Sequence, residues 1–323
     1  MSSDHGTFKY KGIPLLADIG SVFGNTYFVD ARSGSVSNTG KTPDKAKALW
    51  SQAYTLATSN NNDAIFIDGD SEHTETTMLD WTKNRIHTYG CNGAPPGVGM
   101  GCGARVSMGT TGVATDIATL KNTGVRNTFT GLKISNSSAT TTNLYTVAEG
   151  GEYTRFSNCE IYKSGLLLTD GTAELLMNGD TSQFYNCTIG SLENTRGASG
   201  KECPCVMLTL LSITDKMCRD GWFEDCRFLT KAAHQDVCHV YGVGAQCVTR
   251  SLVFKNCTFE NALLAAATVA DAINFDTAQT AGHVLVINPA GVNVSAIAGA
   301  SLKIYVSSGT AQTTDGVSEE IAA

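Results

Sequence analysis

Residues Phe156-Ser-Asn-Cys-Glu-Ile161, Phe184-Tyr-Asn-Cys-Thr-Ile189, Phe223-Glu-Asp-Cys-Arg-Phe228 and Phe254-Lys-Asn-Cys-Thr-Phe259 are four copies of one pattern, Phe-x-Asn/Asp-Cys-x-Ile/Phe. A fifth copy, Phe129-Thr-Gly-Leu-Lys-Ile134, is more degenerate. The first residues of the copies are 27, 28, 39 and 31 positions apart, which is near the length of one three-sided turn of a parallel β-helix. The repeat therefore predicts a β-solenoid over residues 120–262, with each copy as one rung.

Within a copy, the first, fourth and sixth residues are apolar and the third is Asn or Asp in four of the five. The chain is thus predicted to point inward, bend at the Asn, and point inward again, because Asn and Asp tolerate the left-handed backbone of a tight bend. Stacking would align the copies into a Phe ladder, a Cys ladder and an Ile/Phe ladder. We interpret Cys159, Cys187, Cys226 and Cys257 as small buried hydrophobic residues.

The composition agrees with an all-β fold. Of the 323 residues, 42% are hydrophobic and 33 are Gly, which suits short strands joined by turns. The net charge of −7 and the lack of basic clusters argue against a nucleic-acid partner. No apolar run is long enough for a membrane span, and residues 1–20 lack the pattern of a secretion signal, so we expect synthesis in a cytoplasm.

The 11 cysteines form no obvious site. An odd number in a long chain without a secretion signal favours reduced thiols over a disulfide framework. Cys203 and Cys205 are one residue apart, whereas zinc ligands are usually separated by two to four. We therefore predict no metal and no cofactor.

A cap is expected before the first coil, because a solenoid end exposes apolar, unpaired strands. Thr42-Pro43-Asp44 is typical of a helix start, and apolar residues then recur at helical spacing, which predicts a capping helix over about 43–59. Strands are predicted at 26–30 and 64–67, after an N-terminal arm of residues 1–25. Residues 263–323, which contain HVLVIN, NVSAI and LKIYVSS, are predicted to form a small C-terminal β element and a polar tail.

The stretch TYFVDARSGSVSNTGKTPDKAKALWSQAYTLA, followed by DAIFIDGD, resembles the opening of right-handed parallel β-helix proteins of the pectin-lyase-like superfamily. It is most similar to the versions that tailed bacteriophages carry as virion proteins. The resemblance covers about residues 26–262 and also rests on the Phe-x-Asn-Cys rungs. It implies an all-β right-handed parallel β-helix and a place in a phage virion.

Acidic residues that could cleave glycosides in pairs are Asp68, Asp70, Glu72, Asp215, Asp220 and Asp236. The catalytic motifs of polysaccharide-cleaving relatives are absent from the sequence, and Asp68–His73 is interpreted as a solvated turn. In the segment His234–His239, strand alternation would place His239 opposite the other polar residues, so it is interpreted as a surface or satisfied histidine. Residues 89–108 are interpreted as a long turn, because no phosphate-loop ending is present. We predict no catalytic, cofactor-binding or metal-binding residues, and no enzyme.

The function expected from the resemblance is that of a phage capsid decoration, or cement, protein on the virion exterior. Its partners would be the major capsid protein and further copies of itself, most simply in a homotrimer. The alternative is a tailspike or another β-helix protein that binds or depolymerises host glycans. An intracellular binding module unrelated to phage is a third hypothesis, because the fold alone does not determine function.

Overall fold

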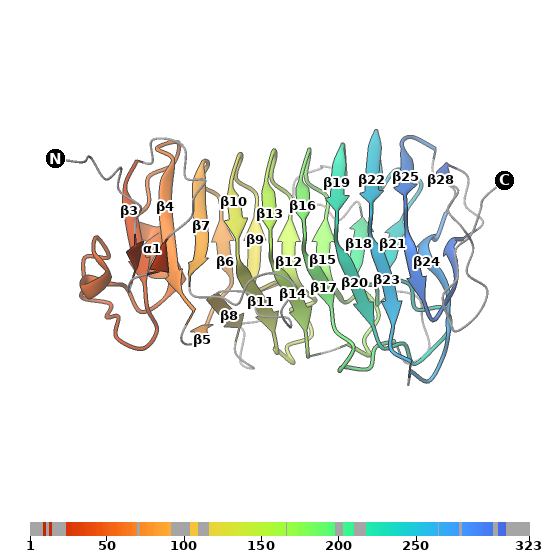
Figure 1. Cartoon of the computed structure of the whole chain (residues 1–323), viewed down its shortest axis with the longest axis horizontal. Helices are drawn as coiled ribbons and strands as arrows, with labels where there is room; N and C mark the ends of the chain where they lie inside the picture. Colours follow the sequence, from red (N-terminus) through yellow and green to blue (C-terminus); the bar gives the residue numbers. More distant parts are fainter. Residues whose placement is uncertain are drawn as a thin grey trace.

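The structure, a computed structural model, is a long stack of parallel coils with a short α-helix near its N-terminal end (Figure 1). The strand pairing confirms the predicted all-β parallel β-helix, because strands from successive coils pair in parallel in three sheets. The described residues are 9–10, 13–14, 24–69, 72–91, 104–108, 116–165, 167–197, 203–209, 218–263, 265–277, 280–299 and 303–307.

From β4 onward, each coil passes through the three sheets in the same order, and the sheets are numbered in that order. Sheet 1 consists of β3 (Thr26–Val29), β4 (Asp63–Asp68), β7 (Ile86–Cys91), β10 (Thr128–Thr130), β13 (Arg155–Ser157), β16 (Gln183–Tyr185), β19 (Gly221–Glu224), β22 (Ser251–Lys255), β25 (His283–Ile287) and β28 (Ile304–Val306). Sheet 2 consists of β5 (Glu72–Glu75), β8 (Ala104–Met108), β11 (Leu132–Asn136), β14 (Glu160–Lys163), β17 (Thr188–Gly190), β20 (Arg227–Thr230), β23 (Thr258–Asn261) and β26 (Ala290–Val292). Sheet 3 consists of β6 (Leu79–Trp81), β9 (Leu120–Asn122), β12 (Tyr145–Glu149), β15 (Ala173–Met177), β18 (Val206–Thr209), β21 (Val240–Val243), β24 (Val269–Phe275) and β27 (Val294–Ala298). Strands β1 (Lys9–Tyr10) and β2 (Ile13–Pro14) form a separate antiparallel pair.

The predicted phenylalanine ladder is the centre of the core. Phe129, Phe156, Phe184, Phe223 and Phe254 pair in register on successive strands of sheet 1 and are fully buried. Neighbouring ring centroids are 4.8, 4.9, 4.7 and 4.9 Å apart, with interplanar angles of 21° or less. This spacing matches the distance of about 4.8 Å between paired strands. The repeat therefore sets the strand register through ring stacking.

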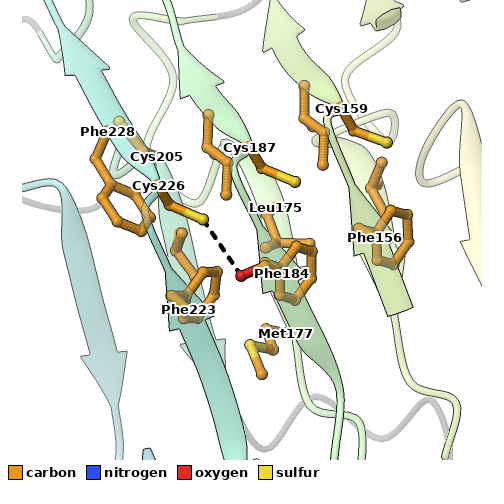
Figure 2. Close-up of a cluster of buried hydrophobic side chains, with 14 of the residues drawn as sticks. Phe156, Cys159, Leu175, Met177, Phe184, Cys187, Cys205, Phe223, Cys226 and Phe228 are labelled. Carbon is orange, nitrogen blue, oxygen red and sulfur yellow. Dashed lines mark hydrogen bonds between the residues drawn. The ribbon is translucent and has the colours of Figure 1, made fainter. Parts of the chain in front are cut away.

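The cysteine ladder runs beside the rings (Figure 2). Cys159, Cys187, Cys226 and Cys257 are buried, free thiols, as predicted. Cys226 donates its S–H to the carbonyl oxygen of Phe184 at 3.4 Å, the contact drawn in Figure 2. Burial raises the pKa of the Cys226 thiol, so it remains protonated. These cysteines act as packing residues, and Cys159, Cys226 and Cys257 also donate weak hydrogen bonds to the preceding coil.

The bend from sheet 1 to sheet 2 is one residue wide and left-handed. The residues at this bend have φ values between 49° and 66°, and they are Gly131, Asn158, Asn186, Asp225, Asn256 and Asn288. Asn tolerates this conformation at little cost, which explains the third position of the repeat. Asn186 also donates its amide to the side-chain oxygen of Asn158 at 2.8 Å, so the bends stack into an exposed ladder.

The N-terminal cap is shorter than predicted. A 3₁₀ helix covers Pro43–Lys45 and the α-helix α1 covers only Trp50–Leu56, because Lys47 between them pairs its backbone with strand β3. Trp50 lies over the end of the core, with its ring centroid 5.0 Å from that of Trp81. The N–H of Ser51 donates to Glu75, and Lys83 donates to the oxygen of Ala57 at the other end of α1. The carboxylate at the N-terminal end and the ammonium group at the C-terminal end of α1 thus both interact favourably with the helix dipole.

The three sheets continue past residue 262. Strands β24 to β28 pair in parallel with β21, β22 and β23 and with one another, so the strand pairing has no break where the sequence predicted a separate C-terminal element. Most of 89–108, the arm 1–25 and the tail lie outside the described residues. No helix in the described ranges is both long and apolar enough to cross a membrane.

Candidate functional site

In the acidic group Asp68–His73, the two ends are not part of the solvated turn that the sequence predicted. Asp68 and His73 are buried, and Nε2 of His73 lies 2.9 Å from the carbonyl oxygen of Asp68. Glu72 is exposed, because β5 starts there and its alternate residues face inward. Asp70 and Asp215 lie outside the described residues. Asp68 and Glu72, the two carboxylates of this group that the structure describes, therefore do not form an exposed acid pair.

The segment His234–His239 divides between surface and core. His234 and Asp236 are neighbours outside, with Nδ1 and a carboxylate oxygen 3.5 Å apart, whereas Cys238 and His239 are buried. The four side chains do not converge, as predicted, although the segment is a turn and not a strand. The prediction of a surface histidine holds for His234 and not for His239, which is fully buried. Burial lowers the pKa of His239 to about 4, so the ring is neutral.

A buried ion pair that the sequence did not predict holds the long loop between β17 and β18. Arg196 donates from Nη1 to Glu174 at 2.7 Å and from Nη2 to the second carboxylate oxygen. Nη1 also lies 3.3 Å from the carbonyl oxygen of Cys203. Nearby, Lys163 donates to the oxygen of Asn143 at 2.8 Å, and burial lowers the pKa of Lys163 to about 8. This cluster is sealed from solvent, so we assign it to the framework.

The two cysteines of the ECPC segment donate to backbone oxygens. Sγ of Cys203 lies 3.1 Å from the oxygen of Thr169, and Sγ of Cys205 lies 3.2 Å from that of Leu229. Burial raises the pKa of both thiols, to about 12 for Cys205. Within the ranges that the structure describes, no three His, Cys, Asp or Glu side chains are grouped to hold a metal ion.

The surface feature best suited to bind a ligand is a group of cations and rings on the bends into sheet 1 and on the outer side of strands β13 and β16. It consists of Arg85, Arg126, Tyr153, Arg155 and Tyr185, and we call it the arginine–aromatic face. Arg85, Arg126 and Tyr153 stack on successive coils, because each backbone N–H donates to the bend of the next coil. The Arg126 guanidinium lies 5.7 Å from the Tyr153 ring, and that of Arg155 lies 4.4 Å from the Tyr185 ring.

The arginines of this face are not neutralised. Among the described residues, no carboxylate oxygen lies within 4.0 Å of the guanidinium groups of Arg85, Arg126 or Arg155. Arg126 and Arg155 are exposed, and the Tyr153 side chain is 54% exposed. Like charges on adjacent coils repel, so the row costs stability. A row that costs stability is typical of a binding surface.

The backbone under this face is also costly. Arg85, Arg126 and Tyr153 have φ values of 55°, 59° and 54°, in the left-handed region. This conformation costs about 1 kcal/mol for a residue other than Gly, and here neither Asn nor Gly relieves it. The bend projects large side chains outward on three successive coils.

Sequence reasoning missed the face because its residues come from different coils. Arg85 and Arg126 are 41 positions apart, and neither belongs to the Phe-x-Asn-Cys pattern. A signal existed in the fixed offset from each rung: Arg126 and Tyr153 both precede the rung phenylalanine, Phe129 or Phe156, by three residues. Aligning the rungs and reading outward from them would have found it.

Comparison with known proteins finds the same fold in carbohydrate-active enzymes. No protein-family model matches the sequence, and no curated protein matches it. A pectate lyase structure has a TM-score of 0.61 at 14% identity, over 89% of this chain and 69% of that one. The pectin methylesterase of Aspergillus niger has a TM-score of 0.54 at 13% identity, over 94% and 92%. Another pectin methylesterase, solved with a hexasaccharide, has 0.52 at 13% identity, over 93% and 94%. At these identities, the likeness shows the right-handed parallel β-helix fold.

These structures bear on two predictions, the absence of an enzyme and the resemblance to β-helix proteins. The prediction of no enzyme does not stand, because the solved structures similar to this chain are a pectate lyase and pectin methylesterases. It rested on missing motifs, and motifs do not transfer between proteins of such low identity. The β-helix part of the resemblance is confirmed.

Proposed function

We propose that this chain is a glycan-acting β-helix protein that binds an acidic polysaccharide along the arginine–aromatic face. The observation that carries the proposal is the row of unneutralised guanidinium groups on successive coils. Adjacent coils are about 4.8 Å apart, which is close to the length of one pyranose residue. A polysaccharide lying along the solenoid axis would therefore meet one coil per sugar.

The side chains supply the two kinds of contact that such a ligand needs. Guanidinium groups bind carboxylates or sulfates through paired, charge-assisted hydrogen bonds. The rings of Tyr153 and Tyr185 offer apolar faces on which the C–H face of a sugar can pack. On the C-terminal side, Glu224 accepts from Trp222 at 3.0 Å and from Lys255 at 2.7 Å, so its carboxylate is already paired.

The fold supports the same class of ligand. The similar structures are named pectate lyase and pectin methylesterase, and one was solved with a hexasaccharide. Their shared coil architecture presents long, regular surfaces suited to polymers. The class of ligand proposed for this chain is thus a linear polymer with acidic groups, and oligogalacturonates serve as the probe.

The test is calorimetric binding of oligogalacturonates of increasing length to the full chain. Affinity should rise with length and fall with added salt, because exposed charges are screened. Arg126→Gln should weaken binding about ten-fold, since a charge-assisted hydrogen bond contributes about 1.5–3 kcal/mol. Arg227→Gln, on the outer side of sheet 2 and paired with Glu260, is the matched control and should change little.

Two outcomes refine or reject this proposal. New reducing ends appearing with time would show that the chain depolymerises its ligand, and binding without them would show a glycan-binding protein. Equal affinity for neutral oligosaccharides of the same length, or no effect of Arg126→Gln, would overturn the assignment of the face.

Capsid decoration is a second proposed function. The observation that favours it is the N-terminal arrangement of β3, the following loop and α1, which carries the resemblance to phage virion proteins. In this proposal the chain binds the major capsid protein as a homotrimer on the virion exterior. Electron microscopy of the native assembly tests it, since a glycan-acting tail component would appear on the tail and a decoration protein on the icosahedral shell.

A further inference from the structure

A carboxylate lies inside the solenoid at the end of β12, four residues before Tyr153 of the arginine–aromatic face. Glu149 is the last residue of β12, points into the core and is fully buried. Its neighbours in register are Asn122 on the preceding coil and Met177 on the following coil. A buried carboxylate is costly unless hydrogen bonds compensate it, so its partners indicate its role.

Glu149 joins three consecutive coils through its two oxygens. Oε2 accepts from the amide of Asn122 at 2.9 Å. Oε1 accepts from the backbone N–H of Gly151 at 2.9 Å and from the hydroxyl of Ser182 at 3.0 Å. All three partners are donors, and an ionised carboxylate is an acceptor only. The arrangement therefore suits the ionised form, because the Asn122 amide and the Gly151 N–H can only donate and a proton on the oxygen that either one contacts would displace its bond.

The bond to Gly151 ties Glu149 to the bend that forms the face. The carbonyl of Glu152 in this bend accepts from the N–H of Arg126 at 2.7 Å, and the next residue is Tyr153. Gly151 fits closely here, because a Cβ would lie 2.3 Å from the oxygen of Gly124. Arg126 and Tyr153 are thus positioned by a backbone segment that Glu149 holds from inside.

The surroundings leave ionisation of Glu149 finely balanced. Burial raises its pKa to about 7, although Asn122, Ser182, Gly151 and Thr154 favour the ionised form. The side chains that hydrogen bond to it are neutral.

The charged groups on the surrounding bends lie nearer the surface. Glu152 is half-buried, and Asp180 is paired with the exposed Arg219 at 3.7 Å. On β9, Lys121 pairs with Asp80 at 3.5 Å. Within each pair the two charges compensate each other. Among the described residues, these pairs therefore exert little net charge effect on the ionisation of Glu149.

We propose that Glu149 is a positioning residue whose ionised carboxylate holds the bend of Gly151–Tyr153, so that its protonation weakens ligand binding on the arginine–aromatic face. This inference rests on the proposed function for the identity of the ligand. It adds regulation of ligand binding by pH. The face binds its acidic ligand best above neutral pH, although the arginines of the face do not titrate in that range.

The experiment compares oligogalacturonate binding to the full chain, to Glu149→Gln and to a control, His87→Gln, at pH 6 and pH 8. His87 lies on the outer side of sheet 1 beside the face, and burial lowers its pKa from its ordinary value, so it serves as a titratable control whose replacement leaves Glu149 in place. The unmodified chain should bind about five-fold more weakly at pH 6 than at pH 8, a typical coupling between two sites. Glu149→Gln should bind weakly and equally at both pH values, and His87→Gln should keep the full pH dependence. A pH dependence that survives in Glu149→Gln would overturn the proposal.

A second measurement keeps the two proposals separable. In nuclear magnetic resonance spectra, the amide of Gly151 should shift with a midpoint near pH 7 in the unmodified chain and not in Glu149→Gln. The amide of Gly34, at the N-terminal end, should not shift in either. Absence of binding at every pH would reject the proposed function alone, whereas a Gly151 amide that does not titrate would reject the role of Glu149 alone.

Discussion

Thr88 lies directly against Phe129 in the stack of inward-facing side chains on sheet 1, because β7 and β10 pair these two residues in register. On sheet 1 the phenylalanine ladder is thus followed by a threonine at its N-terminal end. The hydroxyl of Thr88 is fully buried and has no hydrogen-bond partner in the described structure. An unmade hydrogen bond in an apolar stack is a local defect of the core.

Replacing Thr88 with Val should therefore stabilise the protein. Valine has nearly the same shape, and removing an unsatisfied buried hydroxyl should raise the free energy of unfolding by about 1–2 kcal/mol. Thr128→Val, on the outer side of the neighbouring strand, is the control and should have a much smaller effect. Urea denaturation measures both, and a loss of stability in Thr88→Val would show that the hydroxyl has a partner in solution.

Asp225→Asn should repair a gap in the bend ladder. Asn186 donates to Asn158 at 2.8 Å and Asn256 donates to Asp225 at 3.2 Å, but in the described structure no hydrogen bond joins Asn186 to Asp225. An ionised carboxylate has no proton to donate, whereas an amide could reach the oxygen of Asn186. The gain should be about 0.5–1 kcal/mol in the free energy of unfolding, toward the lower end because the side chains are exposed.

The converse change provides the control for the ladder. Asn186→Asp would place carboxylates on adjacent coils and should lower the thermal midpoint, with added salt restoring part of the loss. If both substitutions shift the midpoint in the same direction, the ladder does not explain either effect.

The ion pair of Glu174 and Arg196 should be sensitive to loss of one partner. Both side chains are fully buried, so Glu174→Leu leaves an uncompensated guanidinium in the core. The expected loss is about 3–5 kcal/mol, and the double variant Glu174→Leu with Arg196→Met should recover most of it. Chemical denaturation of the two single variants and the double variant gives the coupling energy. Additive losses would show that the pair does not act as a unit.

The sequence predicted the parts of this fold that repeat at short range. The rung phenylalanines, cysteines and asparagines lie where the pattern placed them, because ring stacking and left-handed bends are local requirements that recur with each coil. The capping helix was predicted too long, because apolar spacing alone does not show that Lys47 would pair with β3. The continuation beyond residue 262 was missed because those coils lack the Phe-x-Asn-Cys pattern.

The candidate site could not be predicted for a different reason. Arg85, Arg126 and Tyr153 become neighbours only through the stacking of coils, and coil lengths vary. Glu149 has no marker in its local sequence, since its partners Asn122 and Ser182 are 27 and 33 residues away. Such long-range polar contacts require the register, which the structure supplies.

Two buried titratable groups, Glu149 and His239, should change the free energy of unfolding in opposite directions as the pH changes. The folded-state pKa of Glu149 is raised to about 7 by burial, so the native state binds its proton more tightly than the unfolded chain does, and this group lowers stability as pH rises from 4.5 to 7. The folded-state pKa of His239 is lowered to about 4 by burial. The contribution of the neutral His239 to the free energy of unfolding is therefore fully present above pH 6.5 and is lost as the pH falls toward 4. Each effect is about 3 kcal/mol in size.

Because the two windows overlap, the contributions of Glu149 and His239 should nearly cancel between about pH 4.5 and 6.5, and each single variant should expose the other slope. Glu149→Gln should gain stability with rising pH through this range, and His239→Leu should lose it. The double variant should restore a shallow profile. Urea unfolding at each pH measures these slopes, and two single variants with slopes of the same sign would contradict the assignment.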